Sequence, residues 1–230
     1  MKRISGILLA VVASVCLGHS VKAQSHYEGN FFIGAKGGIS ISRVMFHPGV
    51  KQKMPIGGIA GLQARYIEEN HFGILAELNF EQRGWEENFE EYPFSYRRTL
   101  NYIQLPVMAH IYFGSNKAHF FLNAGPEIGV MIGESTSSNF DYTNPETIPG
   151  FPIKDRQIDQ YTLKANKGVD FGISAGIGGE YFVNSRNSLN LECRFYYGLG
   201  NVIPTGRTQT FSAANSMSLM VSLGYWFRIK

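Results

Sequence analysis

The sequence predicts an all-β protein, an eight-stranded antiparallel up-and-down transmembrane β-barrel, and three observations predict it. Eight segments between Phe31 and Lys230 alternate apolar residues with polar or small ones, which is the period of a strand with two different faces. Most run for about 10 to 12 residues, the length with which a tilted strand crosses a bilayer. Their connections alternate between short and long, and no segment keeps a helical period.

The chain begins with features typical of a secretory signal peptide. A charged start precedes an apolar run, Ile4 to Leu17, which is shorter than the about 20 residues of a membrane-spanning helix. The small-x-small motif Val21-Lys22-Ala23 predicts cleavage before Gln24. The expected division is signal peptide 1–23, short periplasmic leader 24–30 and outer-membrane barrel domain 31–230.

Cleavage would change the charge and the cysteine content. The chain has 21 basic and 18 acidic residues, and the signal peptide holds three basic residues and no acid, which leaves 18 of each. This balance gives no charge-based case for nucleic-acid binding. Cys16 would also be lost, and Cys193 alone cannot form an internal disulfide. The exported chain must therefore be held by something other than the disulfides of many small secreted domains.

The eight segments share one pattern. In the fourth, every second residue from Ile103 to Phe113 is apolar, whereas Gln104, Met108 and His110 stand among the residues between them. In chain order the segments are 31–42, 57–66, 71–83, 101–114, 119–130, 169–181, 189–199 and 217–227.

The connections differ in length in a regular way. The short ones lie around 68–70, 114–118 and 184–188, and the long ones at 43–55, 84–100, 132–168 and 200–215. Short turns at one end and long loops at the other are typical of outer-membrane barrels, with the turns on the periplasmic side.

The composition of the two strand faces predicts which face meets lipid. The polar faces are rich in Gly, Ser and Asn, whereas the solvent face of a soluble lipocalin-like barrel would be rich in Lys and Glu. The apolar faces carry almost no charge at mid-strand and gather aromatic residues near the turns. We therefore expect Ile103 to Phe113 to face lipid, and Gln104, Met108 and His110 to face the interior.

Strand parity places eleven titratable residues inside the barrel. Because an unpaired buried charge is costly, opposite signs in so narrow a lumen should pair. We expect a salt-bridge network that plugs the barrel, and a narrow ion or proton path is the alternative. The residues are Lys36, Arg65, Glu77, Glu81, Arg83, His110, Glu127, Asp170, Glu180, Glu192 and Arg194.

The loop 84–100 is the candidate binding surface. It mixes aromatic residues with arginines, a composition typical of interface hot spots. The alternative is a solvated extension of the flanking strands with its own charge pairs. The loop 132–168 is longer still, and loops of that length are usually functional or disordered. The candidate surface residues are Phe89, Tyr92, Phe94, Tyr96, Arg97 and Arg98.

No catalytic, metal-binding or cofactor-binding residues are predicted. The glycines follow strand parity rather than a phosphate-binding pattern. The histidines of the mature chain form no recognisable triad or metal-ligand spacing. They are His26, His47, His71, His110 and His119.

Pro106 and Pro126 lie either side of one short turn and should come close together. Each lacks a backbone donor, and parity turns Pro106 inward and Pro126 outward. We expect a bulge or gap in the ladder between these two strands.

From about Phe31 to Lys230 the chain resembles the eight-stranded outer-membrane β-barrel family labelled porin-family or PorT-like, common in the Bacteroidetes type of Gram-negative bacterium. The segment Tyr102-Ile103-Gln104-Leu105-Pro106-Val107 is similar to the family's aromatic-hydrophobic-x-hydrophobic-Pro strand. The end of the chain, from Ser222, resembles the signal read by the barrel-assembly machinery. It departs at Ile229, where an aromatic residue is usual.

The resemblance implies a fold and a location in the cell outer membrane, but no shared activity. We expect a non-enzymatic binding or scaffold barrel of the cell envelope, surrounded by outer-membrane lipid and inserted by the barrel-assembly machinery, with an envelope protein or extracellular ligand at the long loops. The alternatives are a small-solute or ion channel, a PorT-like component of a secretion or envelope-assembly system, and a rim enzyme.

Overall fold

The computed structural model describes residues 29–230, apart from residues 91 and 208. The predicted signal peptide and all but the last two residues of the leader lie outside the described residues. No helix in the described part is long and apolar enough to cross a membrane. The strands are β1 (Asn30–His47), β2 (Gln52–Lys53), β3 (Ile56–Glu69), β4 (Phe72–Glu87), β5 (Tyr96–Gly114), β6 (Ala118–Ser138), β7 (Val169–Phe182), β8 (Asn187–Asn201) and β9 (Ala213–Arg228), and the 3₁₀ helices are η1 (Pro145–Thr147), η2 (Ile153–Asp155) and η3 (Asp159–Tyr161).

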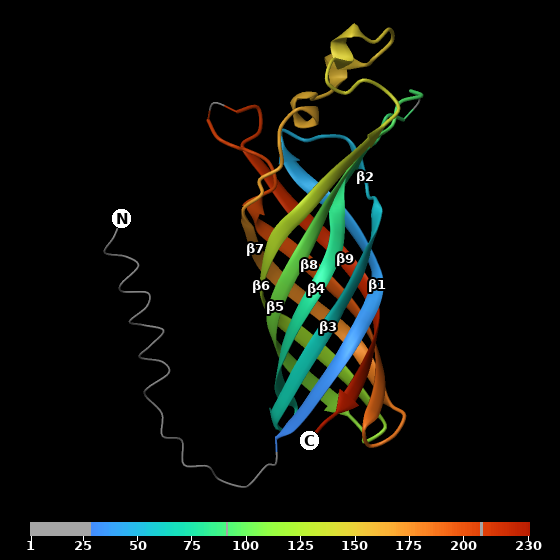
Figure 1. Ribbon diagram of the computed structural model, residues 1–230, viewed down its shortest axis with the longest axis vertical. Coiled ribbons are helices and arrows are strands. Elements are labelled where there is room, and N and C mark those ends of the chain that lie inside the picture. Colours follow the sequence, from blue (N-terminus) through green and yellow to red (C-terminus); the bar gives the residue numbers. More distant parts are fainter. Residues whose placement is uncertain (1–28, 91, 208) are drawn as a thin grey trace, which may run out of the picture.

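Eight long strands form a closed antiparallel ring, which confirms the predicted fold class. Each long strand pairs with the next long strand along the chain, and β1 closes the ring by pairing with β9. Three short turns lie at one end of the barrel, here called the turn end, together with the C-terminus (Figure 1). The long loops and the 3₁₀ helices extend from the other end, the loop end.

The strands run further toward the loop end than the sequence predicts. The segment 84–100 is only partly a loop, because β4 continues to Glu87 and β5 already begins at Tyr96. The short strand β2, which was not predicted, pairs Gln52 with Glu87 and Lys53 with Glu86. The apolar–polar alternation continues into this region, and the strands remain paired beyond the part of the barrel whose outer face is apolar.

The barrel exposes apolar side chains on its outer face and buries charged side chains inside, the reverse of the distribution in a soluble protein. On the outer face, Leu62 and Val169 are each 65% exposed, whereas Arg65 and Glu81 on the inner face are 1% and 0% exposed. On β5 the apolar residues from Ile103 to Phe113 point outward and Gln104, Met108 and His110 are buried, as predicted. A wide apolar outer face of this kind suits lipid contact.

Glycines on the inner face make room for large side chains. A Cβ at Gly38 would collide with the backbone of Val221 in β9, and one at Gly172 would lie 2.6 Å from the ring of Tyr196. The missing Cβ of Gly38 thus lets the backbones of β1 and β9 approach closely, and that of Gly172 leaves room for the Tyr196 ring within a ring of only eight strands.

The ladder between β5 and β6 is interrupted at Pro126. Paired rows run through Pro106 opposite Glu127 and resume at Ala109 opposite Ala124, with none between them. The register is the same on both sides, so the interruption is a gap and not a bulge. This confirms the predicted gap, and its cause is the missing backbone donor of Pro126. Pro106 stays paired with β6, and its own missing donor leaves a second gap, in the ladder between β4 and β5, where the rows stop at Ala76 opposite Val107 and resume at Asn79 opposite Gln104.

Candidate functional site

The lumen holds the eleven titratable side chains assigned to it by strand parity, and all are buried. They lie in three levels along the barrel, and hydrogen bonds through His110 and Asn123 connect two of these levels. Hydrogen-bonding serines, asparagines and glutamines from neighbouring strands fill the spaces between them.

The middle level is built around Arg194. Its guanidinium donates to both oxygens of Glu77, at 2.6 and 2.8 Å, and to Glu192 at 2.7 Å. Lys36 donates to Glu77 at 2.7 Å, and the amide of Asn79 donates to the same carboxylate at 2.9 Å. Two cations and two carboxylates therefore balance at this level.

The level nearer the loop end is built around Arg83. It donates to Glu81 and to Glu127, each at 2.6 Å, and lies 3.5 Å from Asp170. Its guanidinium also stacks over the ring of Tyr196, 3.7 Å from the centroid. Three carboxylates share one cation here, and they are supported by side-chain donors: Ser40 and Gln104 to Glu81, Ser174 to Glu127, and Tyr196 to Asp170.

The level nearer the turn end is built around Arg65. Its guanidinium binds Glu180 in a bidentate manner, at 2.6 and 2.8 Å, between the rings of Phe32 and Trp226. Ser188 donates to the same carboxylate at 2.5 Å. Bidentate geometry and flanking aromatic rings fix both the position and the orientation of this pair.

His110 connects this level to the middle one. Arg65 can only donate, so the Nε2 atom of His110, 3.3 Å away, accepts, and Nδ1 carries the proton donated to Asn123 at 2.7 Å. Asn123 in turn donates to Glu192 at 2.7 Å. A continuous chain of hydrogen bonds thus crosses the lumen, and it can close the barrel to solutes.

An apolar cluster, here called the cap, closes the lumen at the loop end. Trp85 and Phe211 are completely buried and Phe46 lies between them, with ring centroids 5.3 Å from Trp85 and 5.1 Å from Phe211. Phe151, in the long loop 139–168, packs 5.9 Å from Phe89. The loops therefore fold over the barrel mouth. The buried members of the cap are Val44, Phe46, Trp85, Phe89, Tyr96, Leu100, Tyr102, Met131, Phe151, Tyr161, Ala165, Val202, Ile203, Phe211 and Ala214.

Glu87 fastens the long loop to the end of β4. It accepts hydrogen bonds from the hydroxyl of Tyr161 at 2.6 Å and from the amide of Gln160 at 2.5 Å, and Arg156 lies 3.6 Å away. Burial raises the pKa of the Glu87 carboxyl above its ordinary value. Burial also raises the pKa of Tyr161, and the neighbouring Glu87 raises it further.

The candidate loop surface is largely internal. Phe89 and Tyr96 are buried in the cap, and Arg98 donates to Glu134 at 2.6 Å and to the backbone of the long loop. Of the six residues, Tyr92 is exposed, Phe94 and Arg97 are half-buried, and Phe89, Tyr96 and Arg98 are buried.

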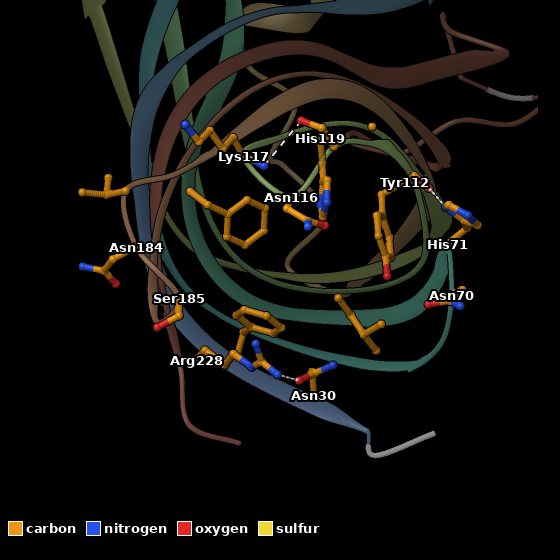
Figure 2. Close-up of a pocket in the computed structure, with 16 residues that line it drawn as sticks. Asn30, Asn70, His71, Tyr112, Asn116, Lys117, His119, Asn184, Ser185 and Arg228 are labelled. Carbon is orange, nitrogen blue, oxygen red and sulfur yellow. Dashed lines mark hydrogen bonds between the residues drawn. The ribbon is translucent and has the colours of Figure 1, made fainter. Parts of the chain in front are cut away.

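The turn end is open. A cavity of about 610 Å³ enters the barrel there, between the three short turns (Figure 2). Tyr112 and His119 stack at its wall with ring centroids 4.7 Å apart. The sequence reasoning missed this site, although Asn70, Asn116 and Asn184 place one asparagine in each short turn. The lining residues are Asn30, Phe32, Ile67, Asn70, His71, Tyr112, Gly114, Ser115, Asn116, Lys117, His119, Phe182, Val183, Asn184, Ser185 and Arg228.

The described residues contain no group of three or more His, Cys, Asp or Glu side chains placed to hold a metal ion. Of the predicted histidines, His110 belongs to the lumen network, and His71 and His119 line the turn-end cavity. His47 ends β1 at the loop end. His26 lies outside the described residues.

Comparison with known proteins gives a family and a fold. The family model "Outer membrane protein beta-barrel domain" matches residues 22–204. The outer membrane protein OprG from Pseudomonas aeruginosa is similar in structure, with 12% identity and a TM-score of 0.51 over 90% of this chain and 99% of that one. Neisserial surface protein A is a further match, with 11% identity and a TM-score of 0.41 over 86% of this chain and 98% of that one. Outer membrane protein W of E. coli is another, with 17% identity and a TM-score of 0.42 over 88% of this chain and 100% of that one. A comparison with curated proteins found no match.

Proposed function

This chain belongs to the outer membrane protein beta-barrel domain family, and from that premise we propose that it is a non-enzymatic binding or scaffold barrel of the cell outer membrane. The apolar outer face would contact lipid, the turn end would lie in the periplasm, and the capped loop end would face outward. An envelope protein or an extracellular ligand at the loop end is the expected partner.

The closed lumen is the observation that carries this proposal. Arg65, Arg83 and Arg194 each bind carboxylates from strands that are not their neighbours in the sheet, and the cap covers the loop end. A solute crossing the barrel would have to break buried, charge-assisted hydrogen bonds, which are the strong ones in proteins. Transport through the lumen is therefore disfavoured, and the surfaces at the two ends remain as the working parts.

The test is single-channel conductance of the folded protein in a planar bilayer, after heat-modifiable migration on a gel has confirmed folding. We expect no conductance steps. Steady conductance of the unaltered protein would overturn the proposal.

One observation favours a second candidate, a narrow cation path. The level around Arg83 has three carboxylates for one guanidinium, so this level attracts cations. In the same bilayer experiment this candidate predicts steady cation-selective current that falls in Glu127→Gln.

A finer proposal rests on the resemblance to PorT-like barrels. The strand Tyr102–Val107 and the C-terminal segment support a role as a component of a secretion or envelope-assembly system. Deletion of the gene should then retain secreted proteins in the periplasm, which fractionation and mass spectrometry would measure. An unchanged secretome would contradict this role.

A further inference from the structure

The turn-end cavity has two cationic side chains and no acidic one among its described lining residues. Lys117 and Arg228 both line it, and none of its described lining residues is an Asp or a Glu. Within the described part of the chain, neither cation forms an ion pair with an Asp or Glu. Two of the five donors of Arg228 are used, one by the side chain of Asn30 (Figure 2) and one, at 3.3 Å, by the main-chain oxygen of Lys230. The cavity therefore favours an anion.

The rest of the lining suits a ligand that also carries amide groups. Asn70, Asn116 and Asn184 come from the three turns, and each amide side chain can both donate and accept hydrogen bonds. Figure 2 places Asn116 close to His119 within the opening, and Lys117 and Arg228 on different sides of it. Ser115 and Ser185 add hydroxyl groups.

An aromatic wall gives the cavity an apolar side. His119 stacks on Tyr112 and meets Phe182 edge-on, with ring centroids 4.8 Å apart. A concave site with an apolar wall and a few convergent polar groups is the usual form of a small-ligand site. Inorganic phosphate would use the two cations and the amide donors, but neither the amide acceptors nor the rings.

We propose that the turn-end cavity binds a short acidic peptide, with Lys117 and Arg228 receiving its carboxylates and the turn asparagines receiving its backbone amides. Peptides of this chemistry occur in the peptide chains of the cell wall. The inference rests on the proposed function, because the turn end meets such peptides only if it lies in the periplasm. It identifies the partner of that end of the barrel.

The chain supplies its own reporter for the test. It has two tryptophans, Trp85 in the cap and Trp226 in the apolar cluster with Phe32 and Tyr112, which both line the cavity. Trp85→Phe therefore leaves one fluorophore, at the turn end. The full-length mature protein, folded in detergent micelles, is titrated with N-acetyl-alanyl-glutamate, with the same peptide amidated at both carboxyls, and with inorganic phosphate.

We expect saturable quenching or a spectral shift with the acidic peptide and none with the amidated one. Lys117→Gln and Arg228→Gln should each weaken binding about tenfold, since each removes one charge-assisted hydrogen bond. Arg186→Gln is the matched control, because Arg186 lies in the same turn as Ser185 but does not line the cavity. Its affinity should be unchanged. Lys117 is exposed in a turn, so its variant should keep the fold.

Three results would overturn the inference: no saturable change, equal binding of the amidated peptide, or equal loss of affinity in Arg186→Gln. Phosphate that binds as tightly as the acidic peptide would also overturn it, by identifying a general anion site. A folded, non-conducting protein that binds no peptide would refute this inference and leave the proposed function standing. Conductance alone would refute only the proposed function.

Discussion

Replacing Arg194 by Met should expose how strongly the buried charges of the lumen depend on one another. The guanidinium joins Glu77 and Glu192, and both carboxylates are at most 2% exposed. Without it, Glu77 keeps Lys36 and Asn79, but Glu192 keeps only the amide of Asn123. The dominant cost is therefore one buried carboxylate without a cation.

Removing one partner of a buried ion pair costs about 3–5 kcal/mol. We expect Arg194→Met to lower the free energy of unfolding by about that amount. Adding Glu192→Gln removes the orphaned charge, so the double variant should recover most of the loss. The matched control Arg186→Met, exposed in a short turn, should stay within about 0.5 kcal/mol of the unaltered protein.

The assay is reversible urea unfolding in lipid vesicles, followed by tryptophan fluorescence. A loss below about 1 kcal/mol for Arg194→Met would refute the reasoning, because it would place the pair in the range of exposed ion pairs. A double variant less stable than the single one would refute it as well. In that case Glu192 would stabilise the barrel through contacts other than its charge.

Three further predictions concern the long loop, the ring closure and the outer face. Because the pKa of Glu87 is raised on folding, the loop 139–168 should dock most strongly at a pH below 4.5, the ordinary pKa, and less strongly as the pH rises through the raised pKa. Limited proteolysis of the loop at a series of pH values should show this change, and Glu87→Gln should make the cleavage rate less dependent on pH. Gly38→Ala should destabilise the barrel by about 1–3 kcal/mol, whereas Gly37→Ala, whose Cβ would lie 3.9 Å from its nearest neighbour, should not; equal losses in urea unfolding would contradict the packing argument. Leu62→Arg should lower the free energy of unfolding in vesicles by about 2–4 kcal/mol, and Met45→Arg, near the loop end, should lower it much less. Equal losses in the two variants would argue against a lipid-facing outer surface.

Much of the barrel could be predicted because strand parity is a local signal. Alternation alone assigns Glu81 and Arg83 to the inside and Leu62 to the outside, since successive side chains of a strand point to opposite faces. The gap at Pro126 follows equally from the chemistry of one residue.

The two ends of the barrel could not be predicted in the same way. The cap joins Phe89 in one loop to Phe151 in another, and the turn-end cavity joins Asn70 to Asn184. Such contacts depend on which loops the closed ring brings together, and no period in the sequence records them. The aromatic composition of 84–100 was a real signal, but of packing within the cap as much as of an exposed surface.

The ring closes between the first and last strands of the chain. β1 pairs with β9 from Phe32 opposite Arg228 to His47 opposite Ala213, and the backbone of Phe31 is hydrogen-bonded to Ile229 and Lys230. This seam cannot form until the whole chain has been synthesised, so β1 must remain as an open edge throughout translation and export. The seam joins residues that lie far apart in the sequence, so a large loop-closure entropy must be overcome before it forms. The seam is therefore the step at which an assembly factor would have most effect on the folding rate.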